Sequence, residues 1–198
     1  MKQYQVTIKG TADLLQNAFH IEGANEGAPD QKSVGKDYSG EWRGKIYLLE
    51  DGTIYQPEAH LCGCLIKAAV TQKVQGQRGK TYKDAVKGGV FIEPAFIPHQ
   101  VNISEFEGAS ILTGPVPDGF KGRVYIDRRV VRIQRAGVVR YRPALVKGWT
   151  LSFILQVLDD KFRTDMLKAI LDTAGQEVGI GDFRPRFGRF IVEHFEEI

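Results

Sequence analysis

The chain has 198 residues, of which 42% are hydrophobic and 26% charged. This balance excludes a disordered tail, a fibrous repeat and a membrane-spanning segment, and the length suffices for one hydrophobic core, so we expect a single domain over residues 1–198. The N-terminus lacks the apolar stretch of a signal peptide, and the two cysteines, Cys62 and Cys64, are too close for an easy disulfide and too few for a disulfide framework. The sequence therefore predicts a cytoplasmic protein.

Basic residues are concentrated in one part of the chain, although the formal net charge is only +3. Residues 121–147 carry nine basic residues and one acid, a net charge of +8, which leaves 18 basic and 23 acidic residues, a net charge of −5, for the rest. A run of charge is usually a solvated face. The opposite sign of the rest of the chain makes this segment a candidate polyanion site.

The first half of the chain alternates predicted elements with polar loops. A strand is indicated at residues 4–8 and a short helix in TADLLQNAF after it, followed by a long loop at residues 22–44. A hairpin is expected next, with Asp51-Gly52 in the two positive-φ positions of its turn. A helix begins near Pro57 and runs to about residue 73, and a second long loop covers residues 75–89.

The second half is richer in strands. Two proline-containing segments, VFIEPAFIP and QVNISEF, indicate edge strands. Residues 121–147 predict a basic β-hairpin with its turn at Arg135-Ala136-Gly137, and WTLSFILQVL predicts a central strand buried on both faces. A helix from Thr164 that ends at Gly175, a Gly/Arg-rich loop over residues 175–189 and a closing strand complete the chain.

This order of elements predicts an α+β protein. We expect a ferredoxin-like or RRM-like antiparallel sheet with two helices, long inserted loops and a protruding basic β-hairpin. In that hairpin Arg128 and Arg132 share one face while Arg129 lies on the opposite face, and Tyr125 and Tyr141 are interleaved with the arginines. A soluble edge strand protected by charge is the alternative explanation.

The segment GIGDFRPRFGRF, residues 179–190, combines three glycines with three arginines. Glycine allows close approach of another backbone, and arginine offers a planar fork of donors that suits phosphate, so the segment predicts an anion-binding surface. A ligand-free turn between the last helix and strand is the alternative. Phe183 and Phe187 either stack on bases or fill the core. The candidate nucleic-acid-binding residues are Arg123, Arg128, Arg129, Arg132, Arg135, Arg140, Arg142, Gly179, Gly181, Arg184, Arg186, Gly188 and Arg189.

Two segments resemble the RAMP superfamily, the RNA-binding subunits of CRISPR effector complexes. The glycine-rich loop before the final strand looks like the signature of that superfamily, and IYQPEAHLCGCLIKA resembles a backbone-subunit motif through Pro57, Leu61 and Gly63. Ala59 and His60 replace the usual small hydroxyl residues, and Cys62 and Ile66 the usual basic ones. The resemblance implies a compact or stand-alone member, of the kind that a mobile element of an antiviral defence system could encode.

The function expected from these features is binding of single-stranded nucleic acid, most of all guide-type RNA, as a non-catalytic backbone-like subunit. The resemblance implies a head-to-tail homo-oligomer or other effector subunits as protein partners. The alternatives are a metal-independent endoribonuclease and an assembly protein that binds an acidic partner. For cleavage, the four histidines and two loop aspartates are available, without one catalytic residue being assigned: His20, His60, His99, His194, Asp30 and Asp37. RNA and single-stranded DNA stay open.

No cofactor, metal or membrane partner is expected. His60, Cys62 and Cys64 are spaced two apart, and on a helix such positions point about 200° away from each other, so they cannot share an ion. The motifs of nucleotide hydrolases, zinc proteases and esterases do not occur in the sequence.

Overall fold

The computed structural model describes residues 1–19, 39–133, 136–158 and 162–198. Its strands are β1 (Lys2–Gly10), β2 (Leu14–Leu15), β3 (Thr53–Pro57), β4 (Val90–Glu93), β5 (Phe96–Asn102), β6 (Ile111–Leu112), β7 (Val124–Ile133), β8 (Ala136–Leu145), β9 (Thr150–Val157) and β10 (Phe190–Glu197). Its helices are α1 (Glu58–Ala69), α2 (Lys83–Gly89) and α3 (Thr164–Thr173), with a π-helical turn at Ala174–Val178 and 3-10 helices at Glu41–Lys45 and Ile103–Phe106.

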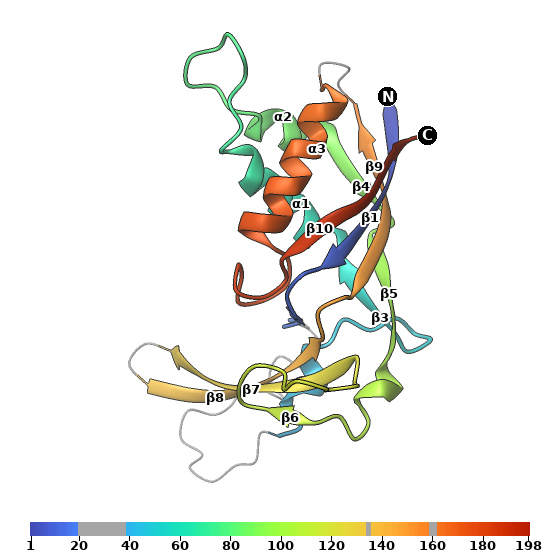
Figure 1. Cartoon of the computed structure of the whole chain (residues 1–198), viewed down its shortest axis with the longest axis vertical. Coiled ribbons are helices and arrows are strands. Elements are labelled where there is room, and N and C mark those ends of the chain that lie inside the picture. Colours follow the sequence, from blue (N-terminus) through green and yellow to red (C-terminus); the bar gives the residue numbers. More distant parts are fainter. Residues whose placement is uncertain (20–38, 134–135, 159–161) are drawn as a thin grey trace.

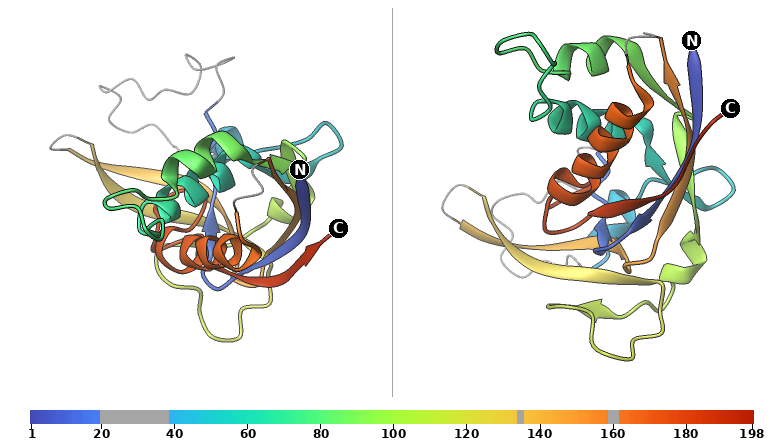
Figure 2. Two further views of the ribbon diagram at one scale, coloured as in Figure 1. Left: turned by 90° about the horizontal axis from the view of Figure 1, so that it is seen from above. Right: turned by 45° about the horizontal axis from the view of Figure 1, so that its top comes forward.

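A four-stranded antiparallel sheet forms the upper layer of the molecule in Figure 1. Its strand order is β10-β1-β9-β4. Helix α1 falls between β1 and β4 in the sequence and α3 between β9 and β10, and both helices cover the same face of the sheet (Figures 1 and 2). This is the ferredoxin-like arrangement, so the predicted α+β fold class is confirmed, with α2 as an additional helix.

The core lies between this sheet and the helices. Alternate residues of β1, namely Tyr4, Val6 and Ile8, are fully buried, because successive side chains of a strand point to opposite faces. Helix α1 buries Leu61, Leu65 and three smaller residues at helical spacing. The predicted strand and helix faces in these two segments agree with the structure.

A second sheet lies across one end of the first, with the order β2-β8-β7-β6. Its centre is the predicted hairpin, in which β7 and β8 pair from Val124↔Leu145 to Ile133↔Ala136. Side chains at the base of the hairpin are buried on both faces, while Figures 1 and 2 show the rest of β7 and β8 extending past the loop that precedes β10. The hairpin is therefore both a packed layer and a projection. A further pair, β3-β5, joins the two sheets.

Several local predictions are wrong where tertiary contacts outweigh local pattern. Residues 12–19 contain no helix, because Leu14 and Leu15 pair with β8 as β2. In β9, Ser152 is exposed between buried Leu151 and Phe153, because helices cover only one face of the sheet; its central position is confirmed. Helix α2 occupies the end of the loop predicted at residues 75–89.

Turn details also differ from the prediction. Among the described residues of the first hairpin, only Gly52 has a positive φ, so Asp51 instead accepts a hydrogen bond from the Thr53 amide. Ala136 and Gly137 belong to β8 and not to the turn. Gly175 does not end α3: the chain continues as a π-helical turn, and a side chain at Gly175 would lie 2.2 Å from the Phe190 carbonyl oxygen. Residues 22–38 of the first predicted loop lie outside the described residues.

Candidate nucleic-acid interface

The loop at residues 179–189, called the terminal loop below, is folded tightly on itself. Gly179, Gly181 and Gly188 all have positive φ, which favours glycine. A Cβ atom at Gly188 would lie 1.8 Å from the Ile180 carbonyl oxygen, and one at Gly181 would lie 2.5 Å from the Leu15 carbonyl oxygen. The space next to these glycines, which the sequence assigns to a bound strand, is therefore filled by the protein's own backbone. The glycines serve to shape the loop.

The terminal loop lies against the hairpin. The Arg129 guanidinium lies 4.7 Å from the centre of the Phe187 ring and 5.9 Å from that of Phe183. Its Nε donates to Asp127 Oδ1 at 2.6 Å, which fixes its direction. Phe187 is buried, whereas the Phe183 side chain is 43% exposed with a φ of 55°. Phe187 thus fills the core, and Phe183 lies at the surface.

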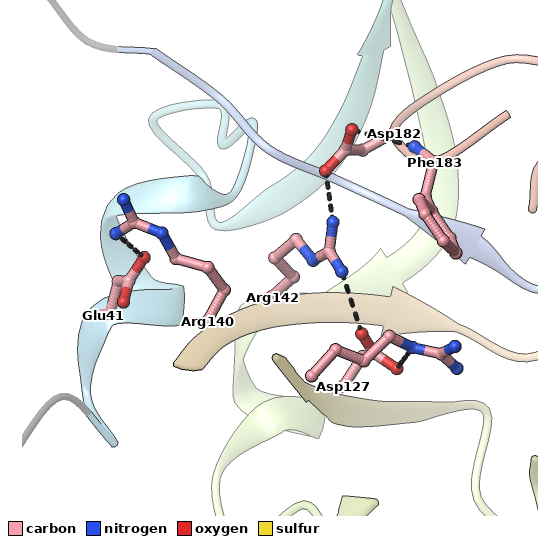
Figure 3. Close-up of polar contacts among 7 residues, drawn as sticks. Glu41, Asp127, Arg140, Arg142, Asp182 and Phe183 are labelled. Carbon is pink, nitrogen blue, oxygen red and sulfur yellow. Dashed lines mark hydrogen bonds and ion pairs between the residues drawn. The ribbon is translucent and has the colours of Figure 1, made fainter. Parts of the chain in front are cut away.

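Arg142 holds the two segments together from inside. It donates to Asp127 Oδ2 at 3.3 Å and to Asp182 Oδ2 at 2.7 Å, and it is only 5% exposed (Figure 3). Asp182 also accepts the amide of Phe183 at 2.8 Å, which orients the start of the exposed part of the loop. A guanidinium enclosed by two carboxylates cannot reach a phosphate, so Arg142 positions the interface and is removed from the candidate binding set.

The two faces of the hairpin carry different arginines. Because cross-strand partners share a face, the pairs Arg129↔Arg140 and Asp127↔Arg142 lie on the face toward the terminal loop. Arg128 and Arg132 lie on the opposite face, where Arg128 donates to the Tyr141 hydroxyl at 3.1 Å. The predicted two-sided character of the hairpin is therefore correct in the structure, and the basic residues do not all point to one surface.

Two further candidate arginines are held by carboxylates. Arg140 donates to Glu41 Oε1 at 2.9 Å, and its side chain is 23% exposed (Figure 3). Arg123 forms a two-pronged ion pair with Glu105 and donates to the Gln100 carbonyl oxygen. These side chains, like that of Arg129 beside Asp127, already have a carboxylate partner, which lowers what they can contribute to a bound anion. Arg135 lies outside the described residues.

Three arginines of the terminal loop remain available. Arg184, Arg186 and Arg189 are exposed, and in the part of the chain that the structure describes none of them has a carboxylate partner. Arg186 lines the same cavity as Arg129 of the hairpin. Cationic groups from segments about 60 residues apart in the sequence therefore meet at one surface, which suits the successive phosphates of a nucleic-acid strand.

Sequence analysis missed an aromatic cluster centred on Tyr55 of β3. Tyr55 packs against Tyr47, with ring centres 5.6 Å apart, and against Phe96 at 4.8 Å. Tyr47 also contacts His60 edge to face at 5.5 Å. Phe96 is 56% exposed and its ring is tilted by 54° from that of Tyr55, so the cluster exposes mainly the Phe96 ring. The sequence indicates this cluster only through Tyr47 and Tyr55, which lie on either side of the Asp51-Gly52 turn.

His60 is the imidazole nearest to this cluster. Burial, and to a smaller extent the positive charge of Arg184, lower the pKa of His60 below its usual range, so the ring is neutral at pH 7. The Gln56 side-chain amide lies within hydrogen-bond distance of His60 Nδ1.

The two cysteines face different partners. The Cys62 thiol donates to Glu58 Oε2 at 3.0 Å, and the Cys64 thiol donates to the Ala174 carbonyl oxygen at 3.3 Å. Burial raises the pKa of each thiol to about 12, so both stay protonated. Within the described ranges no three His, Cys, Asp or Glu side chains are grouped as metal ligands, and no helix there is long and apolar enough to cross a bilayer.

Comparison with known proteins gives a fold-level likeness. No family model and no curated protein matches the sequence. Among solved structures, the chain is similar to one chain of the cryo-EM structure of the type III-B Cmr-beta bound to cognate target RNA, with a TM-score of 0.55 and 11% sequence identity. The match covers 100% of this chain but 60% of that chain. The likeness shows that this chain shares its fold with a chain of that structure.

Proposed function

We propose that the chain binds single-stranded RNA along the surface where the terminal loop meets the loop-facing side of the hairpin. The observation that carries this proposal is the contact of Arg129 with Phe183 and Phe187, because it brings the free arginines of the terminal loop beside those of the hairpin. Binding rests mainly on phosphates, and sequence specificity is low. The core of this interface consists of Arg129, Arg184, Arg186 and Arg189.

Flat side chains border this cationic surface. Phe183 is exposed beside Arg129, and the cluster of Tyr47, Tyr55 and Phe96 lies beyond Arg184. Single-stranded nucleic acid needs both elements, because phosphates bind cations and unpaired bases stack on rings. Arg128 and Arg132 on the far face of the hairpin form a second, weaker contact, and the three glycines of the terminal loop act by shaping it.

Beyond RNA binding in general, the specific role proposed for the chain is that of a backbone-like subunit on a guide-type RNA. The fold shared with a chain of a complex that holds target RNA supports this role. Successive copies then assemble head to tail along the strand, and single-stranded DNA is a poorer ligand. His20, Asp30 and Asp37, named above for cleavage, lie outside the described residues.

Filter binding of nuclease-treated protein to a labelled 20-nucleotide single-stranded RNA tests the proposal. With about three phosphates neutralised by the unpaired arginines of the terminal loop, the plot of log affinity against log salt has a slope of about −2. A duplex RNA of the same length and an acidic peptide serve as competitors and are expected to compete weakly. Strong competition by the acidic peptide, or affinity that does not change between 50 and 300 mM salt, would overturn the proposal in favour of a protein partner.

A further inference from the structure

A groove of about 790 Å³ lies open to solvent on one face of the β10-β1-β9-β4 sheet, at its β4 edge. Two cross-strand pairs of β4 and β9 line it, Phe91↔Gln156 and Glu93↔Ile154. Cross-strand partners share a face, and the residues between them in each strand are buried toward the helices, so the groove lies on the helix-free face (Figure 2). None of the described lining residues belongs to the hairpin or the terminal loop, so this surface is distinct from the proposed RNA interface.

The floor of the groove is apolar although it faces solvent. Phe91 is 44% exposed, and Ile154 of the neighbouring strand is half-buried. Pro94 and Ala95 extend this apolar surface past the end of β4. On the other side it ends at β1, which places Gln5 opposite Ile154. A bordered apolar surface of this kind indicates an interaction site, because its exposure to water is unfavourable.

Among the described residues that line the groove, the charged groups are both acidic. Glu93 is exposed at the rim, and Glu58 lies at the start of α1, where its amide donates to the Ala95 carbonyl oxygen at 2.9 Å. The Glu58 carboxylate accepts the Cys62 thiol at 3.0 Å, and in the described part of the chain neither glutamate has a cationic partner. Two carboxylates without a cation repel phosphates, so the groove disfavours nucleic acid and attracts a positively charged ligand.

The form of the groove fits an extended segment of chain. Small-molecule sites enclose about 70–90% of their ligand, which an open groove does not do. In an extended segment, residues i and i+2 point the same way, so one apolar and one basic side chain can enter the groove together. A lysine or arginine there would lay its apolar stem along Phe91 and bring its charged end to Glu93, which uses both parts of the surface.

We propose that the groove is a docking site for an extended segment of a different protein, in which an apolar residue and a lysine or arginine stand two positions apart. The chain's own basic segment, residues 121–147, is not the occupant, and this exclusion rests on the proposed function, which assigns that segment to RNA. The inference goes beyond that function, because it gives the chain a protein-binding surface separate from the RNA interface.

Fluorescence anisotropy with a labelled ten-residue peptide tests the docking site. In this lysine peptide, leucine and lysine alternate at every second position and serine fills the positions between them; in the control peptide, glutamate replaces lysine. Wild-type protein is expected to bind the lysine peptide with micromolar affinity and the glutamate peptide about tenfold more weakly. A lysine peptide with benzoylphenylalanine in place of one leucine is expected to form photocrosslinks to groove residues of β4 or β9, which mass spectrometry identifies.

Three variants test the two parts of the surface. Glu93→Lys reverses the exposed charge at the rim and is expected to weaken binding of the lysine peptide about tenfold. Glu107→Lys, at an exposed residue outside the groove, changes the net charge equally and leaves this affinity unchanged. Phe91→Ala removes the apolar wall and is expected to weaken the lysine peptide about fivefold, while filter binding of RNA stays as in wild type.

The outcomes separate the two proposals. Binding of neither peptide by wild-type protein, crosslinks found only outside the groove, or equal losses in Glu93→Lys and Glu107→Lys would overturn the docking site and leave RNA binding in place. Self-association of wild-type protein that Glu93→Lys abolishes, measured by analytical ultracentrifugation, would assign the groove to a second copy of this chain and overturn its assignment to a different protein. A wild-type protein that binds the lysine peptide in the groove but no RNA would overturn only the proposed function.

Discussion

Replacing Arg184, Arg186 and Arg189 with Ala removes the free cations of the terminal loop without touching its core. All three side chains are exposed, and among the described residues none has a carboxylate partner, so each is available to neutralise one phosphate. For a single strand each neutralised phosphate contributes about 0.7 to the slope of log affinity against log salt, so the triple variant loses about 2 in slope. If the wild-type protein and the variant bind equally at 1 M salt, a slope difference of about 2 corresponds to about 100-fold weaker binding of the variant at 0.1 M salt.

The assay is filter binding across a salt series, with urea unfolding as a check of stability. The matched control replaces Lys73, Arg78 and Lys80 with Ala, which changes the net charge equally. These three residues are exposed in the segment before α2, at the opposite end of the molecule from the hairpin (Figure 1). If the control variant lost as much slope as the terminal-loop variant, the effect would come from net charge alone and the reasoning would be refuted.

Two further predictions concern stability. Gly188→Ala forces a Cβ atom against the Ile180 carbonyl oxygen and is expected to lower the free energy of unfolding, measured in urea, by about 3 kcal/mol or more. Gly114 has open space around it, so the control Gly114→Ala leaves the free energy of unfolding nearly unchanged. Equal effects of the two substitutions would contradict the tight packing of the terminal loop around Gly188. Burial lowers the pKa of His99 to about 3, and neither of its ring nitrogens has a partner among the described residues. As pH falls below about 6.5 the unfolded chain takes up a proton that the folded chain does not, so stability falls by about 2 kcal/mol between pH 6.5 and pH 5. His99→Phe is expected to remove this part of the decline, and an unchanged pH profile would show that His99 titrates normally.

Sequence pattern was sufficient for elements whose burial follows a regular period. The basic hairpin, the first and last strands and α1 all show such a period, and their predicted positions agree with the structure. It failed where a long-range partner decides the conformation. Leu14 and Leu15 occur in a stretch with a helical pattern, yet they pair with β8. Helix α2 was predicted as a loop because its sequence, KDAVKGG, ends in two glycines, which disfavour helix.

The arrangement of the candidate site could be predicted only in part. The arginines of the hairpin and the terminal loop were found from composition, because clustered charge is visible in one dimension. Which of them are free was not visible, because their carboxylate partners are distant: Asp182 is 40 residues from Arg142, and Glu41 is 99 residues from Arg140. The same separation concealed the approach of Phe96 to Tyr55.

Arginine modification by phenylglyoxal, with and without a bound 20-nucleotide RNA, tests most directly whether the hairpin and the terminal loop form one binding surface. Mass spectrometry reports the extent of modification at each residue. We expect the RNA to protect Arg129, Arg184 and Arg186 together, while Arg78 and Arg163 are modified to the same extent in both samples. Protection of the hairpin arginines without those of the terminal loop, or equal protection of Arg78, would contradict the account.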